Sequence, residues 1–502
     1  GVDIFFVISG YLMAQLYNQG SIRSFYVRRI KRIFPSYLLT ISITTFVVAY
    51  IASPVDFIQR FDRVWYDLLG ISNIAFWLQS SYFDDQNFRP LLNLWSLGVE
   101  FQYYLIVPFL LDFLRKKKFL LLTTILVSIV ATFFITTIST KTSFFMMPLR
   151  IWEFLIGAYI AWTYINFNNK YLIFVPILSL TILISVIFFF PLNIYSDSFV
   201  YGHVGIASLM IALLTGIILL YPFPSRILSN KNLFTNLLTK LGDYSYSIYL
   251  IHFPVIVMFN YQPFSGTILG SDSISKTILM LLTTGVFSIL IHKYVELARY
   301  KNNFNKFFYT ILIFSTILII GSKFISNWKY QNQQSEVKLI FNAYLDQDSF
   351  RCGTKFRVLN PLKPICLIND FKSNKKVLLL GDSHANSLKP IFVDTMRLYK
   401  ITHYFYASND PLMKPKYNAK KIYKDILKFN ITDVIFHYNT NFYKTSNYYK
   451  ELDELLLHLK SKKINVFFIS PVPVYKENIP EILYNEITSE KPIIKRETLL
   501  KH

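Results

Sequence analysis

The strongest constraint on the fold is a series of long apolar stretches in the first 326 residues. A helix needs about 20 apolar residues to cross the hydrocarbon core of a bilayer. Ten stretches come near that length: 1–17, 36–52, 94–114, 119–138, 147–165, 171–190, 204–221, 244–262, 277–293 and 307–326. An eleventh, 68–80, is broken by polar residues. The pattern predicts a polytopic α-helical membrane domain with about ten spans.

The composition agrees with a membrane protein. Hydrophobic residues make up 53% of the chain and charged residues only 16%, whereas an ordinary soluble domain has roughly 25% charged residues. The net charge of +22 does not indicate nucleic-acid binding, because much of the basic excess flanks apolar stretches, where topology signals are expected. We therefore expect the lipid bilayer, and no nucleic acid, as a partner.

The distribution of Lys and Arg predicts the orientation in the membrane. The basic clusters at 23–32 and 115–118 should both face the cytoplasm, so we expect 68–80 to be re-entrant or interfacial. The predicted cytoplasmic loops then hold 16 Lys and Arg, against 5 in the opposite loops. This topology places everything after Asn327 on the extracytoplasmic side. It also places Gly1 outside, so we expect one more helix upstream.

A different pattern follows the apolar region. Residues 327–370 are polar and are expected to form an extracytoplasmic linker, and short apolar runs alternate with helix-length stretches from 371 to 502. Such alternation predicts an α/β domain with a parallel sheet. The expected strands and the covering amphipathic helix are Lys376–Leu380, Val434–His437, Val466–Ser470 and Tyr448–Lys460.

The two cysteines of the chain both lie in the expected linker. Cys352 and Cys366 are separated by thirteen residues. In an oxidising compartment such a pair readily forms a disulfide, although two unpaired thiols are the alternative.

The sharpest local motif is Gly381-Asp382-Ser383-His384, which follows an apolar run. A tight turn at the carboxyl end of a parallel strand is a place where sites form in α/β sheets. There the hydroxyl of Ser383 can act as a nucleophile, with backbone N–H groups helping to hold an oxyanion. The alternative is an ordinary strand–turn–helix with Ser383 near the helix N-cap.

This segment resembles the SGNH hydrolase superfamily, whose nucleophilic serine lies in a Gly-Asp-Ser turn. The resemblance implies a flavodoxin-like three-layer α/β fold and an oxyanion-hole asparagine, for which Asn439 is the best candidate and Asn409 a weaker one. The family's late Asp-x-x-His is absent, since Asp453 and His458 are five apart on the amphipathic helix and are expected to be structural. We therefore expect the catalytic base to lie beyond His502.

Ionisable residues inside apolar stretches are functional candidates, because a charge in a membrane must face a partner or a cavity. Asp3 interrupts the first stretch, Glu100 lies in the third, and Arg150 and Glu153 lie three residues apart in the fifth. Buried opposite charges are expected to pair. A purely structural ion pair is the alternative to a functional cluster.

A basic cluster precedes Pro35 at the expected cytoplasmic end of the second stretch. Arg28, Arg29 and Arg32 could hold the phosphates of a nucleotide-like donor through bidentate hydrogen bonds. A topology signal alone accounts for these residues equally well. His252, just before Pro254, is expected to be a hydrogen-bonded structural group rather than a base.

Together these stretches resemble membrane acyltransferase family 3, whose members O-acylate bacterial surface glycans. The matching blocks are Gly1–Leu12, Phe25–Pro35, Leu94–Pro108, Arg150–Gly157, Leu241–Pro254 and Val295–Glu296. A C-terminal SGNH-like domain is a known architecture of this family. The resemblance implies a multi-pass protein of the bacterial inner membrane with its C-terminal domain outside.

The resemblance also implies a reaction. Acetyl-CoA, or a similar acyl-CoA, would donate from the cytoplasm to a hydroxyl of an envelope glycan such as lipopolysaccharide O-antigen or peptidoglycan, and no metal is expected. The arginine cluster would bind donor phosphates, the four membrane charges would line the transfer path, and Ser383 would complete delivery. The family's catalytic histidine is expected upstream of Gly1, and that role does not pass to His252. The alternatives are a polytopic transporter and a non-catalytic envelope scaffold.

Overall fold

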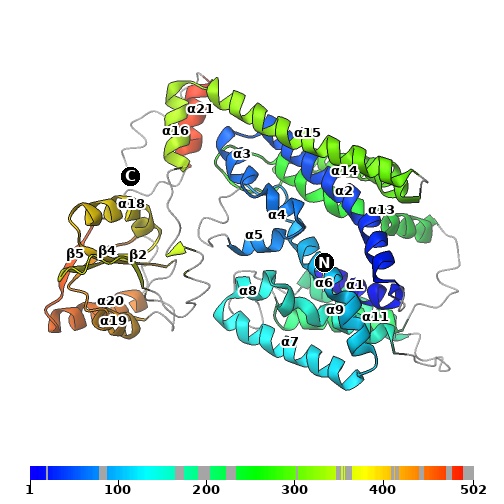
Figure 1. The fold of residues 1–502 in the computed structure, drawn as a ribbon, viewed down its shortest axis with the longest axis horizontal. Coiled ribbons are helices and arrows are strands. Elements are labelled where there is room, and N and C mark those ends of the chain that lie inside the picture. Colours follow the sequence, from blue (N-terminus) through cyan, green and yellow to red (C-terminus); the bar gives the residue numbers. More distant parts are fainter. Residues whose placement is uncertain are drawn as a thin grey trace. The chain divides into compact units, whose positions relative to one another are not determined.

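The computed structural model describes most of the chain in two compact units. The described residues are 1–17, 21–78, 88–163, 174–189, 204–221, 233–300, 303–345, 352–353, 356, 365–408, 412, 418–439, 446–470 and 478–489. The first unit comprises Gly1–Leu78 and Phe88–Gln331, and the second includes the chain from Asn332 onward. Each unit is described by itself below (Figure 1).

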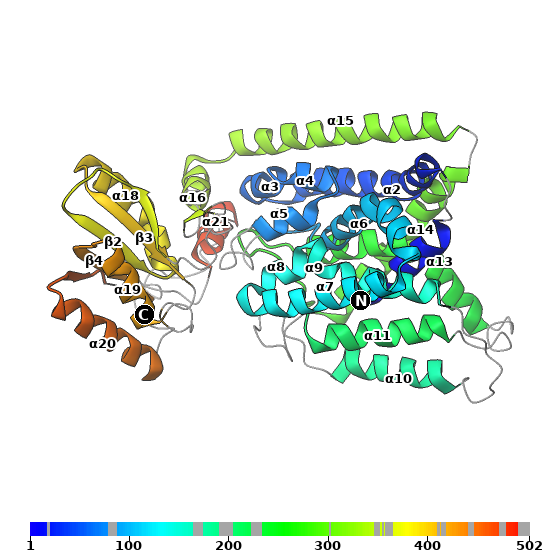
Figure 2. The same ribbon diagram turned by 60° about the horizontal axis from the view of Figure 1, so that its bottom comes forward.

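The first unit is helical, and each of the ten expected apolar stretches contains a helix. These helices are α1 (Val2–Leu16), α2 (Ile22–Ile51), α6 (Leu94–Arg115), α7 (Lys118–Ile138), α9 (Met147–Ala161), α10 (Phe174–Phe189), α11 (Ile206–Leu220), α13 (Leu233–Phe259), α14 (Ile274–Ile291) and α15 (Phe304–Gln331). Figure 2 shows α15 running beside α2 and α10 beside α11. Shorter helices between them are α3 (Pro54–Phe61), α4 (Val64–Leu68), α5 (Ser72–Leu78) and α8 (Thr140–Phe145).

The expected count of ten spans is not confirmed. Among the described residues, five helices are long and apolar enough to cross a membrane: α2, α6, α7, α15, and α14 continued to Glu296. Helix α11, for example, is apolar but has only 15 residues, and at about 1.5 Å per residue it falls short of a bilayer core about 30 Å thick. Of the doubtful stretch 68–80, the described residues 68–78 include the last residue of α4 and all of α5, which have 5 and 7 residues. Neither is long enough to span.

Two glycines allow α1 and α9 to pack with their backbones in contact. A Cβ atom at Gly10 would overlap the carbonyl oxygen of Phe154, and one at Gly157 would overlap the carbonyl oxygen of Val7. Small residues at such crossings let helices approach closely. The same approach brings the Asp3 side chain of α1 against Arg150 of α9.

The close crossing predicts that Gly157→Ala destabilises the helical unit. The added methyl group meets backbone, which cannot rotate away, so we expect a loss of about 1–3 kcal/mol of unfolding free energy. Thermal unfolding of the full chain in detergent measures this. Gly285→Ala in α14 is the matched control, because nothing lies within 4 Å of its Cβ position and alanine favours the helix. Equal unfolding temperatures for the two variants would contradict the tight crossing.

The second unit contains a five-stranded sheet. Its strands are β1 (Cys366–Asn369), β2 (Lys376–Gly381), β3 (Thr402–Ala407), β4 (Asp433–His437) and β5 (Asn465–Phe468), in the order β1-β3-β2-β4-β5. Its helices are α16 (Ser335–Leu345), α18 (Ser383–Leu398), α19 (Ala419–Lys428), α20 (Ser446–Ser461) and α21 (Ile479–Ser489). The three expected strands and the covering helix are thus present.

The expectation of a parallel sheet requires a correction. Strands β3, β2, β4 and β5 are parallel, but β1 pairs antiparallel with β3, so the sheet is mixed. Strand β1 was not predicted, because it lies within the stretch 327–370, which was expected to be a linker and which also contains α16. Strand β3 was not predicted, because His403 and three aromatic residues stand where an aliphatic run is usual.

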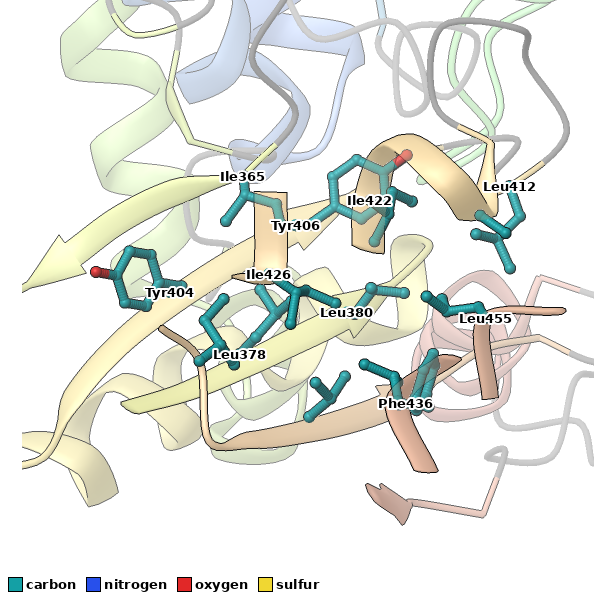
Figure 3. Packing of buried hydrophobic residues seen from close by; sticks show 14 of the residues in the cluster. Ile365, Leu378, Leu380, Tyr404, Tyr406, Leu412, Ile422, Ile426, Phe436 and Leu455 are labelled. Atoms are coloured by element: carbon teal, nitrogen blue, oxygen red, sulfur yellow. The ribbon is translucent and has the colours of Figure 1, made fainter. Parts of the chain in front are cut away.

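The sheet lies between two helical layers, as the three-layer expectation requires. On one face, Leu378, Leu380 and Phe436 pack against Ile422 and Ile426 of α19 and Leu455 of α20, as Figure 3 shows. On the other face, Val377, Leu379 and Phe405 pack against Ala385 and Phe392 of α18. Alternate residues of β2 thus enter opposite cores, which is the period-two pattern of a strand buried on both sides.

Cys352 and Cys366 form the expected disulfide. The bond joins the segment before the sheet to β1 across a sequence separation of 14 residues.

We expect the double variant Cys352→Ser/Cys366→Ser to lose about 3 kcal/mol of unfolding free energy, because a loop of this length loses about that much closure entropy in the unfolded chain. Pulse proteolysis of the full chain in urea measures the loss. Reductant should shift the wild-type midpoint to that of the double variant and leave the variant unchanged. A wild type insensitive to reductant would contradict a stabilising role.

Candidate functional site

The described residues hold candidate site residues in both units. In the second unit, Ser383 is the first residue of α18 and is separated from the end of β2 by Asp382 alone. The chain continues from β2 to β3 on one side and later to β4 on the other. This reversal of direction is the position at which open α/β sheets bind ligands.

Gly381 makes the turn before Ser383 possible. It pairs with His437 across β2 and β4, and a Cβ atom at Gly381 would overlap the carbonyl oxygen of His437. A side chain at this position would therefore push the two central strands apart. The glycine of the motif is explained by this close approach.

Asp382, rather than Ser383, is the N-cap of α18. One carboxylate oxygen accepts a hydrogen bond from the His384 N–H at 2.8 Å, and the other accepts one from the Asn439 N–H at 2.8 Å. Ser383 was considered as an N-cap from the sequence, but the N-cap position is occupied by its neighbour Asp382. No acceptor for the Ser383 N–H is found among the described residues, so this donor is available at the start of a helix.

The structure places Asn439 at the same end of the sheet as Ser383. Asn439 follows β4, is buried, and is tied through its backbone to Asp382. The weaker candidate Asn409 lies outside the described residues. His458 stacks on Tyr423 at 4.7 Å between ring centroids and lies 3.6 Å from Glu454, which gives it a packing role on the outer helices.

Two histidines that the sequence analysis left without a role lie beside this turn. The rings of His384 and His437 are 5.7 Å apart between centroids. Burial lowers the pKa of the His384 imidazole, the Asp382 carboxylate partly offsets this, and His437 lowers that pKa further. The position of His437 directly before Tyr438 and Asn439, at the end of an apolar strand, is the signal that could have indicated it.

The first unit brings Asp3, Arg150 and Glu153 together. The Arg150 Nη2 atom lies 2.7 Å from Asp3 Oδ1 and 3.3 Å from Glu153 Oε1. Arg150 and Glu153 are fully buried, and the guanidinium carbon lies 5.5 Å from the centroid of the Phe6 ring. Two carboxylates thus surround one guanidinium. The Nε and Nη1 atoms of Arg150 have no hydrogen-bond partner in the described part of the chain.

Glu100 belongs to a different group. Its Oε1 atom accepts hydrogen bonds from Ser9, at 2.5 Å, and from the Tyr104 hydroxyl. The Glu100 carboxylate also interacts electrostatically with the guanidinium groups of Arg29 and Arg32. The sequence therefore identified the charged members of this group but missed the two hydroxyl donors.

The arginine cluster lies in the first three turns of α2. Arg28 and Arg32 are exposed, and Arg28 Nη1 donates to Ser24 Oγ at 3.2 Å. Arg29 is half-buried, and its Nε atom has no hydrogen-bond partner among the described residues. Two exposed guanidinium groups beside a half-buried one are suited to an anionic ligand.

Two further ionisable residues, His252 and Glu296, were given no catalytic role from the sequence. The Nδ1 atom of His252 lies 2.9 Å from the Tyr249 carbonyl oxygen of its own helix, in keeping with a structural group. Glu296, at the end of the π-helical turn η2 (His292–Glu296), contacts Ser247 Oγ at 2.6 Å and His292 Nδ1 at 2.7 Å.

The acyltransferase domain family matches residues 1–293, and the family of SGNH domains fused to such acyltransferase domains matches residues 351–498. The chain belongs to the acyltransferase 3 family. Both buried charge groups of the first unit fall within the first match, and Ser383 and Asn439 fall within the second.

Relatives of this acyltransferase 3 protein include an uncharacterized protein of Haemophilus influenzae, 34% identical over 34% of this chain and 76% of the relative. The O-acetyltransferase OatA of Staphylococcus aureus is 28% identical over 61% of this chain, which spans 53% of OatA. Another Staphylococcus aureus protein, provisionally named an O-acetyltransferase, is 25% identical over 96% of this chain and 84% of its own length. No solved structure matches.

Proposed function

We propose that this protein is a membrane O-acetyltransferase that moves an acetyl group from cytoplasmic acetyl-CoA to a hydroxyl of an exported envelope glycan. The observation that carries the proposal is the geometry at Ser383. The serine lies at the carboxyl end of the central strand, its own N–H has no acceptor among the described residues, and the preceding Asp382 holds the Asn439 N–H. The relatives named O-acetyltransferases support the reaction class.

The donor would bind at the arginine cluster. Arg28 and Arg32 offer exposed guanidinium groups and Arg29 a half-buried one, and guanidinium groups recognise phosphates through paired hydrogen bonds. The residues present therefore suit the diphosphate of acetyl-CoA. Glu100, held by Ser9 and Tyr104, would fix the position of this basic surface from the buried side.

The second charge group would organise the transfer path within the membrane unit. Asp3, Arg150 and Glu153 lie on α1 and α9 and combine two carboxylates with one guanidinium. The unpartnered Arg150 donors could hold the carbonyl oxygen of an acyl group during passage.

Ser383 would complete the transfer outside. Its Oγ atom attacks the acyl carbonyl carbon while a base takes the hydroxyl proton, and the base then passes that proton to the departing carrier as the bond between carrier and acyl carbon breaks. The Ser383 N–H and Asn439 would stabilise the oxyanion. A glycan hydroxyl then attacks the acyl-serine and gives its proton to the base, which returns the proton to Ser383 Oγ as the serine ester bond breaks.

The remaining parts of the proposal concern organisation. We place 1–326 in the inner membrane as a multi-pass acyltransferase unit and 371–502 outside it as an SGNH-like domain. Residues 327–370 would also lie outside, where they connect the two and supply α16 and β1. The basic bias of the loops on one side supports this orientation.

The test uses the full-length protein in sealed vesicles, with radiolabelled acetyl-CoA on the side of Arg28 and a soluble glycan on the side of Ser383. Base-labile label on the glycan is the expected result. Free acetate crossing without glycan ester would indicate a transporter instead. No labelled glycan and no transport would contradict the proposal.

A further inference from the structure

The Asp382 carboxylate links the two segments that would supply oxyanion donors. It is 3% exposed and accepts one N–H from each segment, from His384 in α18 and from Asn439 after β4. These segments are far apart in the sequence. They come together because β2 and β4 are neighbours in register, with Gly381 opposite His437.

The carboxylate also helps to determine which backbone donors of α18 remain free. The first N–H groups of a helix have no partner within the helix. Asp382 occupies the His384 N–H, and the Asn386 N–H bonds the Asp382 carbonyl oxygen at 3.1 Å. The Ser383 and Ala385 N–H groups are left without an acceptor among the residues that the structure describes. One of these two free donors therefore belongs to the nucleophile itself.

We propose that Asp382 is a positioning residue that assembles the oxyanion site of Ser383, by joining the nucleophile turn to the Asn439 segment and by directing the helix to present the Ser383 N–H. The inference rests on the proposed role of Ser383 as an acyl-accepting nucleophile. It adds a function to a residue that would otherwise only cap a helix.

The proposed role requires both hydrogen bonds of the Asp382 carboxylate, the one from the His384 N–H and the one from the Asn439 N–H. A carboxylate has two acceptor oxygens, so it can hold two N–H donors at once, whereas a serine hydroxyl at an N-cap holds one. Oxyanion donors must lie within a few tenths of an ångström of the position where charge develops, because their effect falls as their alignment is lost. Breaking the link to Asn439 would loosen that alignment without removing any group that touches the substrate.

Asp382→Ser is therefore the informative variant. It keeps a favoured N-cap for α18 but is too short to bridge to Asn439. We expect kcat for acyl transfer from p-nitrophenyl acetate by the full-length protein to fall about 10- to 100-fold, with KM changing less than about twofold. Affinity for an alkyl boronic acid, which forms a tetrahedral anionic adduct on serine, should fall by the same factor. Asp382→Asn, which keeps one acceptor oxygen, should likewise lower kcat and leave KM nearly unchanged.

Asp394→Asn is the matched control, because Asp394 lies on the same helix with its side chain 78% exposed. It should match the wild type in every measurement. Rates are expressed per trypsin-resistant molecule, so that loss of folded protein is not counted as loss of activity. An unchanged kcat in Asp382→Ser, or parallel losses of substrate and boronate affinity, would overturn the positioning role.

Ser383→Ala separates this inference from the function on which it rests. If Ser383→Ala is inactive while Asp382→Ser has full kcat, the positioning role is wrong and the nucleophile stands. If Ser383→Ala keeps full activity, the proposed role of Ser383 is itself wrong.

Discussion

Ser383→Ala should reduce glycan acetylation by about a thousandfold or more, to the background of a strain lacking the gene. The substitution removes the only atom of the turn that can form the acyl ester, and loss of a catalytic nucleophile has effects of at least this size. The measurement is the O-acetyl content of the surface glycan by mass, in cells that carry the full-length gene. Folding should be unaffected, because the hydroxyl of Ser383 is not the N-cap of α18.

Ser387→Ala is the matched control for that prediction. Ser387 lies one turn further along the same helix, is exposed, and donates only to the Ser383 carbonyl oxygen at 3.1 Å. It should acetylate the glycan at the wild-type level. Acetylation that persists in Ser383→Ala would show that the membrane unit acylates the glycan without the serine.

Arg150→Met should be the most damaging single change in the membrane unit. It removes the guanidinium that contacts the buried Asp3 and Glu153 carboxylates, and removing one partner of a buried ion pair costs about 3–5 kcal/mol. We expect a large fall in the thermal unfolding temperature of the full chain in detergent, together with loss of glycan acetylation.

A triple variant distinguishes a structural ion pair from a functional group. Arg150→Met combined with Asp3→Asn and Glu153→Gln removes all three charges, so no uncompensated charge remains buried. We expect stability to recover to within about 1 kcal/mol of the wild type, while acetyl transfer stays at least tenfold lower. Recovery of transfer together with stability would show that the three residues form a structural pair only.

The regular features of the fold were predictable from the sequence because they depend on local patterns. Apolar stretches near 20 residues predict helices such as α6 and α7, and Val377–Leu380 predicts a central strand. The strand β3 was missed because its burial on both faces accommodates His403 and aromatic rings that an aliphatic pattern does not include. The antiparallel β1 was not predicted, because its place in the sheet depends on pairing with β3, which is distant in the sequence.

The buried charge groups also depend on contacts between distant segments, which a local sequence pattern does not predict. The sequence identified Asp3, Glu100, Arg150 and Glu153 as costly residues in apolar surroundings and led us to expect that buried opposite charges pair, but it did not show which distant residues come together. The structure places Glu100 with two hydroxyl groups and the other three residues around one guanidinium. The division depends on the crossing of α1 and α9 at Gly10 and Gly157, which no local pattern encodes.

By itself the sequence determined the helical membrane-like half, the α/β half and the serine turn, since each follows from the hydrophobic period and motif within a short segment. Only the tertiary structure decided which distant groups meet: Asp382 with Asn439, and Arg150 with Asp3. The physical reason is that hydrogen bonds and ion pairs act over a few ångströms. Strand order and helix crossings, rather than sequence neighbours, set those distances.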